Sequence, residues 1–340
     1  MRFEYYHKGL DDVPKLSIDG TVDNAIHFSH WAGNQTHASL RADTSTEIAL
    51  NLVASPDRDE LTRGITLVTN NHFDTDGLLS VWTVLTGERA LDLREKLIAA
   101  AEAGDFSEYT NEQAIRASIV IQGMDEAVPD GGVVSPLARQ LAAGSDGAAV
   151  TVDEARAYEL LLPEVERVLT RTDDYEPLWR EGWNEVVASM ESFARGGSRV
   201  YEDERTRISI ITLAPDLSAN GFKPTRHVPP YTAISHHARG EVYLIGIPVA
   251  GGWAYRVDYP YYSWAETFVR PRIRRRDFAP VVARLNELEN ASTHEGRWKL
   301  DRSELTSALK FGDEHGALGV STLAPEAVAE EMGKAVVSSQ

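Results

Sequence analysis

The feature that most constrains the fold is a short apolar strand that runs directly into a polar loop and an apolar helix. Residues 64–70 are β-branched and mostly apolar, as expected for a strand buried on both faces of a parallel sheet. The loop His72-Phe73-Asp74-Thr75-Asp76-Gly77 follows, and residues 78–85 have the apolar density of a buried helix. This strand–loop–helix order is the first half of a βαβ unit. The sequence therefore predicts an α/β protein with a mainly parallel sheet and helices on both of its faces.

The rest of the chain divides into two regions of different character. Residues 90–195 read as helical almost throughout, whereas closely spaced strands and turns follow Gly196-Gly197-Ser198. We predict a domain of residues 1–197 with a helical insertion at about 90–195, and a smaller mixed-sheet α/β domain of residues 198–340. In the second region we expect strands at 207–213, 232–235, 241–247 and 253–259, and helices at about 277–290 and 302–310.

Composition limits the classes of function. Apolar residues make up 42% of the 340 residues and charged residues 25%, which is enough for a core. The net charge of −18 argues against nucleic acid or an anionic membrane as a partner. There is no signal-peptide pattern or long apolar run, so we expect a cytoplasmic protein. There are no cysteines, so any metal must be held by His, Asp and Glu.

The polar loop is the best candidate for chemistry. In open α/β sheets, ligands bind where the strands end at their carboxyl edge. His72, Asp74 and Asp76 alternate along the loop, so an extended backbone would point all three the same way. Two carboxylates and one imidazole suit Mn²⁺ best, with Fe²⁺ or Zn²⁺ as alternatives. A second interpretation is that Asp74 and Asp76 cap the following helix.

The loop, together with Ser80 in the helix, resembles the first motif of the DHH phosphoesterase superfamily. The resemblance implies that His72, Asp74 and Asp76 bind a pair of Mn²⁺ ions that activate water for attack on phosphorus. It covers only the strand, the loop and the start of the helix. As a whole the chain looks more like an uncharacterised bacterial family that shares this opening motif.

The later motifs of that superfamily are less clear in this chain. Its namesake Asp-His-His is absent, and the nearest string is Ser235-His236-His237. Asp125 is a candidate for the ligand of the second motif, because it follows the apolar run Ile119-Val120-Ile121, which resembles the end of a strand. The same segment also reads well as a helix.

A second group of His and carboxylate residues precedes the strand: His27, His30, His37, Asp43 and Glu47. These residues could fold over the carboxyl edge of the sheet and complete a metal site, and we choose His30 as the ligand. The alternative is that these histidines lie at the surface or form ordinary hydrogen bonds.

Two further candidates lie in the second half of the chain. His236 and His237 are adjacent, so in a strand they would face opposite sides. We assign His236 a catalytic role and His237 a role in substrate binding. Within the basic run Arg270–Arg276, the guanidinium groups of Arg272, Arg274 and Arg276 are candidates to bind an anionic substrate. Alternatively, the run is solvated and paired with acids, or forms a contact in a homo-oligomer.

Three functions fit these features. The first is a metal-dependent hydrolase of phosphoester or phosphoanhydride bonds in a small anionic molecule. The second is a non-haem iron oxygenase that uses His72, Asp74 and either His236 or His237. The third is a non-catalytic binding or regulatory protein that keeps the fold. Analysis of the bound metal would separate them.

Overall fold

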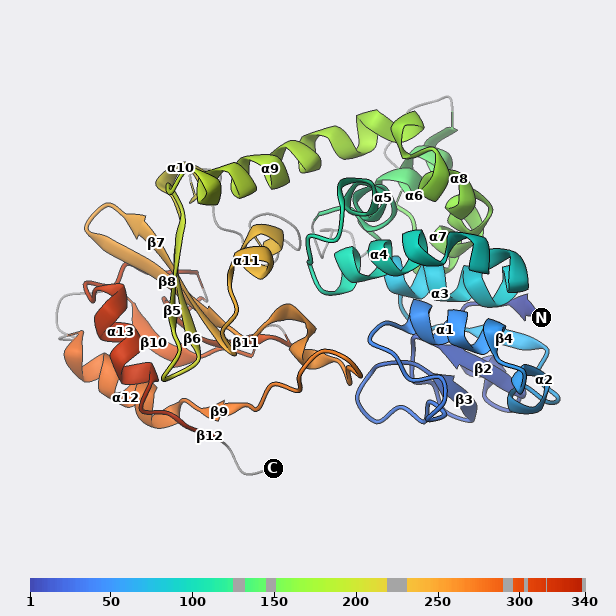
Figure 1. Cartoon of the computed structure of the whole chain (residues 1–340), viewed down its shortest axis with the longest axis horizontal. Helices are drawn as coiled ribbons and strands as arrows, with labels where there is room; N and C mark the ends of the chain where they lie inside the picture. Colours follow the sequence, from blue (N-terminus) through green and yellow to red (C-terminus); the bar gives the residue numbers. More distant parts are fainter. Residues whose placement is uncertain are drawn as a thin grey trace. The chain divides into compact units, whose positions relative to one another are not determined.

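The computed structural model describes residues 1–124, 132–144, 151–218, 231–289, 296–302, 305–315 and 317–337 (Figure 1). Within these residues, two compact units are distinguished. Unit 1 holds the described residues within Met1–Val186, Tyr231–Thr232 and Ala265–Pro271, and unit 2 holds those within Val187–Ser218, Ala233–Trp264 and Arg272–Val337. None of the described helices has both the length and the apolar character needed to cross a membrane.

The division between the units differs in two ways from the boundary predicted between residues 197 and 198. It falls at Val186 and Val187, inside the long helix α9 (Glu176–Ala194). Ala265–Pro271, which the sequence assigned to the second domain, belongs to unit 1. Composition does not show that Ala265–Pro271 packs with the first part of the chain, because this packing depends on side-chain contacts between segments far apart in sequence.

The sheet of unit 1 is entirely parallel. Its strands are β1 (Arg2–Phe3), β2 (Lys15–Ile18), β3 (Ala25–Phe28) and β4 (Leu67–Thr69), in the order β1-β4-β2-β3. All three neighbouring pairs run in the same direction. Their carboxyl ends therefore meet at one edge of the sheet, and the parallel character predicted for the strand before the polar loop is confirmed.

Helices of unit 1 cover this sheet. The helix after the polar loop, α3 (Thr75–Thr86), contacts β1, β2 and β4, and α1 (Ser45–Ala54) contacts β3 and packs beside α3. Both helices lie on the same face of the sheet (Figure 1). The sequence predicted helices on both faces. The next layer contains α4 (Arg94–Asp105) and α5 (Glu112–Gln122), which pack against each other.

The helical region predicted at residues 90–195 is present, and it includes the apolar run at residues 119–121. Besides α4, α5 and α9, its helices are α6 (Pro136–Ala143), α7 (Glu154–Leu161) and α8 (Val165–Thr170), whereas the short α2 (Arg58–Leu61) precedes β4. The apolar run at residues 119–121 lies inside α5, so it is not a strand. Asp125 lies outside the described residues.

The sheet of the second half is mixed, as predicted, but it is the larger of the two. Among its described strands, only β6 and β7 run parallel to each other. Its six strands have the order β10-β11-β8-β7-β6-β5, with bounds β5 (Arg199–Asp203), β6 (Ile208–Thr212), β7 (Val242–Val249), β8 (Gly252–Asp258), β10 (Arg297–Leu300) and β11 (Ser307–Gly312). A separate pair is formed by β9 (Arg276–Asp277) and β12 (Val336–Val337). The helices are α10 (Pro215–Ser218), α11 (Tyr231–His237), α12 (Ala279–Leu288) and α13 (Pro325–Met332).

Two segments of the second half differ from the prediction. Residues 232–235, expected as a strand, lie in helix α11. The end of the segment 302–310, expected as a helix, forms β11, which pairs with β8 and β10. The side chains of Leu309 and Phe311 are buried there. Burial between two neighbouring strands outweighs the helical preference of this segment.

Candidate metal centre

Three neighbouring strands deliver polar side chains to one edge of the sheet of unit 1. After β4, His72 and Asp74 lie in the loop and Asp76 lies in the first turn of α3, while Asp19 directly follows β2 and His30 lies two residues after the end of β3. Asp19 has a backbone φ of +66°, a left-handed conformation that Asp tolerates better than most residues. The carboxyl edge of a parallel sheet is therefore the candidate site, as the sequence predicted.

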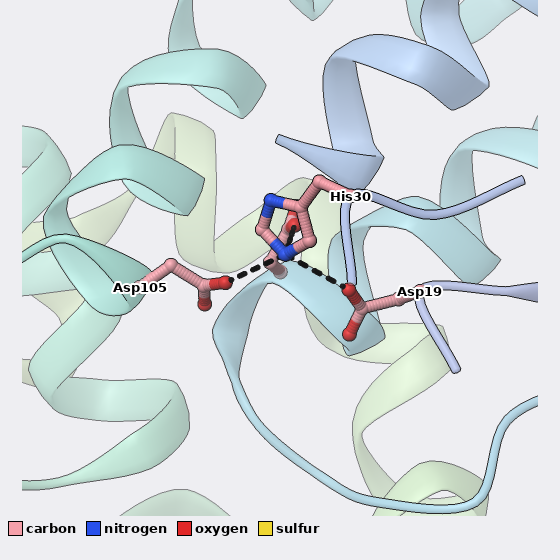
Figure 2. A group of neighbouring side chains, drawn as sticks. Asp19, His30 and Asp105 are labelled. Carbon is pink, nitrogen blue, oxygen red and sulfur yellow. Dashed lines mark ion pairs between the residues drawn. The ribbon is translucent and has the colours of Figure 1, made fainter. Parts of the chain in front are cut away.

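The first group of ligand atoms is fully enclosed. It consists of Asp19, His30, Asp76 and Asp105, all buried, with ligand atoms within 4.8 Å of one another. His30 Nε2 lies 3.4 Å from Asp19 Oδ1, 3.6 Å from Asp76 Oδ2 and 3.3 Å from Asp105 Oδ2. Figure 2 shows the imidazole between Asp19 and Asp105, which comes from the end of α4. We call these four residues the buried set.

The second group shares Asp19 and reaches the surface. It consists of Asp19, His72 and Asp74. His72 Nε2 lies 2.9 Å from Asp19 Oδ2 and 3.1 Å from Asp74 Oδ2. The side chains of His72 and Asp74 are 25% and 23% exposed, so solvent reaches this group. We call it the open set. Asp19 directs one carboxylate oxygen towards each set.

The first turn of α1 holds two of the carboxylates. The backbone N–H groups of Ser45 and Thr46 donate to the two oxygens of Asp76, each at 2.7 Å. The hydroxyl of Ser45 donates to Asp19 Oδ1 at 2.7 Å. Unpaired N–H groups at a helix N-terminus favour negative charge, so the start of α1 fixes both carboxylates in place.

The hydrogen bond on the far side of the His30 ring determines its tautomer. His30 Nδ1 lies 2.7 Å from the backbone carbonyl oxygen of Asp43, so Nδ1 must carry the proton. In a neutral imidazole, Nε2 then presents its lone pair to the buried set. This is the arrangement typical of histidines that bind metals.

Asp74 has two functions in the structure. Its Oδ1 accepts a hydrogen bond from the N–H of Gly77 at 2.7 Å and caps α3, while Oδ2 faces His72. The helix-cap interpretation therefore applies to Asp74. It does not account for Asp76, whose oxygens are bound by the start of α1 instead.

The polar loop has close neighbours that require glycine at position 77. A Cβ at Gly77 would lie 2.6 Å from Asn70 Nδ2, 2.8 Å from the Tyr158 hydroxyl and 3.0 Å from Asp19 Oδ2. Tyr158, from α7, donates to the carbonyl of His72 at 3.0 Å and accepts from Asn70 Nδ2 at 2.9 Å. Gly77 thus lets α3 begin directly against the ligands.

Burial and mutual repulsion shift the pKa values of these groups. Burial, with the charge of Asp19, raises the pKa of Asp76 to about 7. Burial, with the charges of Asp74 and Asp76, raises the pKa of Asp105 well above its usual range. Burial opposes a charged His30, but Asp105 and Asp19 outweigh it and raise the pKa of His30. Without a cation, the cluster must therefore hold extra protons.

The residues present fit divalent metal ions. Asp19 Oδ2 and His72 Nε2 are buried and, among the described residues, accept or donate no well-formed hydrogen bond, although they lie 2.9 Å apart. Atoms that are close but not aligned with each other are typical of ligands that converge on an ion. The two sets together hold four carboxylates and two imidazoles. Their formal charge of −4 equals the charge that two divalent cations would neutralise. Oxygen-rich sites with some nitrogen suit Mn²⁺, Fe²⁺ or Zn²⁺.

The histidines and arginines predicted as site residues in the second half of the chain lie in unit 2, whereas both ligand sets lie in unit 1. His236 and His237 are in helix α11 rather than in a strand, and His237 stacks on Phe193 with ring centroids 4.8 Å apart. Neither histidine belongs to either ligand set.

The arginines predicted to bind substrate also belong to unit 2. Arg272 and Arg274 are exposed. Arg276 donates to the carbonyl of Thr206 at 2.6 Å and lies 3.7 Å from Glu241, so its guanidinium is engaged within its own unit. The role of all three in substrate binding stays a prediction.

Sequence reasoning missed two residues of the site. Asp19 was not among the candidates, although its place directly after strand β2 was a usable signal. Asp105 ends α4 and carries no local pattern that marks it as a ligand. Of the upstream histidines, the structure brings His30 to the site, whereas His27 contacts the carbonyl of Val22 and His37 contacts Ser39.

Comparison with known proteins identifies the family. Residues 2–335 match the model of a family of unknown function, DUF6687, and the chain belongs to that family. No curated protein and no solved structure matches the chain.

Proposed function

We propose that this protein is a metal-dependent hydrolase that holds two divalent cations, Mn²⁺ fitting best, and cleaves phosphoester or phosphoanhydride bonds in a small anionic molecule. The observation that carries the proposal is the position of Asp19. One of its oxygens faces the buried set and the other faces the open set. A carboxylate shared in this way holds two cations side by side, as in two-metal hydrolytic sites.

Each part of the site has its own role in this proposal. A pair of cations supplies Lewis acidity towards phosphoryl oxygens and lowers the pKa of a water molecule. His30, Asp76 and Asp105 hold the enclosed side, and the N-terminus of α1 orients Asp76. His72 and Asp74 hold the side that solvent reaches.

The substrate approaches at the open set. His72 and Asp74 are the partly exposed members, and the Trp31 ring lies edge-on to His72 with centroids 5.3 Å apart. The carboxylates alone would repel an anion. An anionic substrate therefore binds only when the cations are in place, so metal and substrate binding are coupled.

The composition of the site favours hydrolysis over the oxygenase alternative. The iron site considered from the sequence uses His72, Asp74 and either His236 or His237, and neither of the last two belongs to the ligand sets among the described residues. The sets contain four carboxylates and two imidazoles, which is too rich in charge for that class.

The test is hydrolysis by the purified full-length protein after removal of metal and addition of Mn²⁺. The substrates should include a phosphomonoester, a phosphodiester and a phosphoanhydride. Asp19→Asn is expected to lower the rate by a factor of at least about 100, because both sets lose a charged ligand. Asp153→Asn is the control, because Asp153 caps α7 and belongs to neither set. If Mn²⁺ binds but none of the substrates is cleaved, the non-catalytic alternative is favoured.

A further inference from the structure

Arg270, the first arginine of the basic run, lies in a segment of unit 1 that is far in sequence from the N-terminal part of that unit. We call this segment, Ala265–Pro271, the strap. The carboxylate of Asp43 holds its tip. Asp43 Oδ1 accepts from the backbone N–H groups of Phe268 and Val269, and Oδ2 accepts from the N–H of Arg270 at 3.0 Å and from its Nη1 at 2.7 Å.

The other donors of Arg270 reach the end of α4. Its Nε and Nη2 donate to both oxygens of Glu108 at 2.8 and 2.6 Å, and Nη2 also donates to Glu102 at 2.8 Å. Glu102 lies in the last turn of α4, three residues before Asp105. One guanidinium, only 17% exposed, therefore joins the segment that carries Asp43 to the end of α4.

The end of α4 carries a ligand of the buried set, Asp105, and the segment with Asp43 contacts another, His30. The carbonyl of Asp43 accepts from His30 Nδ1, and the N–H of Glu266 in the strap donates to the carbonyl of His30 at 2.7 Å. Phe106 directly follows Asp105. The centroid of its ring lies 5.9 Å from that of the His30 ring and 4.8 Å from the Cζ atom of Arg270. The strap thus contacts the surroundings of His30 and of Asp105, whose ligand atoms lie 3.3 Å apart.

We propose that Arg270 is a positioning residue that sets the spacing of His30 and Asp105, and with it the affinity of the buried set for its cation. This inference rests on the metal site of the proposed function. Residues that orient metal ligands typically change metal affinity by about 10- to 100-fold when they are removed. The planar fork of arginine matches several carboxylates at once, whereas lysine offers a single point charge.

The experiment is a titration of the metal-free, full-length protein with Mn²⁺, followed by electron paramagnetic resonance and by thermal unfolding. In the parent, two Mn²⁺ ions joined by Asp19 give a spin-coupled signal. Arg270→Ala is expected to weaken one of the two binding steps by about 10- to 100-fold. With two Mn²⁺ added per chain, the variant still gives the six-line signal of an isolated ion, whereas the parent gives the coupled signal. Arg270→Lys is expected to fall between the two, because it keeps the charge but loses the fork.

Arg116→Ala is the matched control. Arg116 is also in unit 1, is 18% exposed, pairs with Glu112 and Asp173, and stacks on Trp179 at 4.0 Å. It contacts neither ligand set. This variant is expected to lose thermal stability as Arg270→Ala does, but to keep both binding steps and the coupled signal.

The results test the metal site and the positioning role of Arg270 separately. If the parent binds no Mn²⁺, the proposed metal site is wrong. If the parent binds two ions and Arg270→Ala binds them with the same affinity, Arg270 does not position the ligands. An equal loss of affinity in Arg116→Ala would also overturn the inference, because the effect would then be one of general stability. If Arg270→Ala does not fold, Arg270→Lys and Glu108→Gln give the same comparison with smaller changes.

Discussion

Asp19 Oδ2 lies 2.9 Å from His72 Nε2, although the two residues follow different strands of the sheet. The contact exists because β2 and β4 are parallel neighbours, so the loops that leave them start at the same edge. Asp19 Oδ1 at the same time faces the buried set. The stability of the metal-free protein and its response to metal should therefore both depend on Asp19.

Asp19→Asn should separate charge from backbone effects, because Asn tolerates the left-handed φ of this position as well as Asp does. Burial opposes the charge of Asp19, but His72 and His30 outweigh it and lower the pKa of Asp19, so we expect the metal-free variant to unfold at a lower temperature than the parent. Mn²⁺ should stabilise the parent by about 2.7 kcal/mol per site at about 100 times its dissociation constant. Thermal melts with and without Mn²⁺ measure this. An equal Mn²⁺ response in parent and variant would contradict the shared-ligand role.

Asp74 allows its two functions to be tested separately. Asp74→Asn should keep the cap on α3, because Asn caps helices about as well as Asp, but should weaken Mn²⁺ binding to the open set. Asp74→Ala should lose both the cap and the ligand, and destabilise the metal-free protein by about 0.5–2 kcal/mol. Denaturant unfolding and Mn²⁺ titration of both variants provide the measurement. Parent-like Mn²⁺ affinity in Asp74→Asn would leave Asp74 as a cap alone.

The sequence was most informative where a local pattern and the fold coincide. The strand, polar loop and helix at 64–86 were recognisable because a buried strand, a helix cap and an apolar helix each leave a local signature. His30 could be selected as one of several upstream histidines. Asp105 could not, because only the packing of α4 on α1 and α3 brings it to the site.

Other parts of the fold depend on contacts that no local pattern records. The strand at 25–28 and the strand at 307–312 are defined by their neighbours in each sheet rather than by alternation of polar and apolar residues. The strap is the clearest case. Arg270 belongs to a basic run that suggested substrate binding, yet its partners Asp43, Glu102 and Glu108 lie more than a hundred residues earlier.

Gly77→Ala should disrupt the site from a position that is not a ligand. The added methyl group would meet Asn70, Tyr158 and Asp19 Oδ2 at 3.0 Å or less, and two of these contacts are too short to keep. We expect a lower unfolding temperature and weaker Mn²⁺ binding, because α3 or Asp19 must move. Circular dichroism and Mn²⁺ titration test this. A variant with parent-like stability and affinity would show that the start of α3 is less constrained than the structure indicates.

Metal binding should strengthen as the pH rises. Asp76 has its pKa raised from 3.8 to about 7 in the folded, metal-free protein, so its contribution to stability is present below about pH 4 and is lost as the pH rises through about 7. His30 and Asp105, whose pKa values are also raised, must likewise lose protons to bind metal. Mn²⁺ titrations at about pH 6 and about pH 8 should show tighter binding at the higher pH, by up to about tenfold per unit for each proton released. Affinity that does not change with pH would contradict the involvement of these groups.

Anomalous X-ray scattering from crystals of the full-length protein grown with Mn²⁺ tests the central claim most directly. The account predicts two manganese peaks per chain, one next to each oxygen of Asp19. The first should be bound by His30, Asp76 and Asp105, and the second by His72 and Asp74. No peak at Asp19, or a single ion that leaves one of its oxygens without metal, would contradict the proposal of a two-cation site.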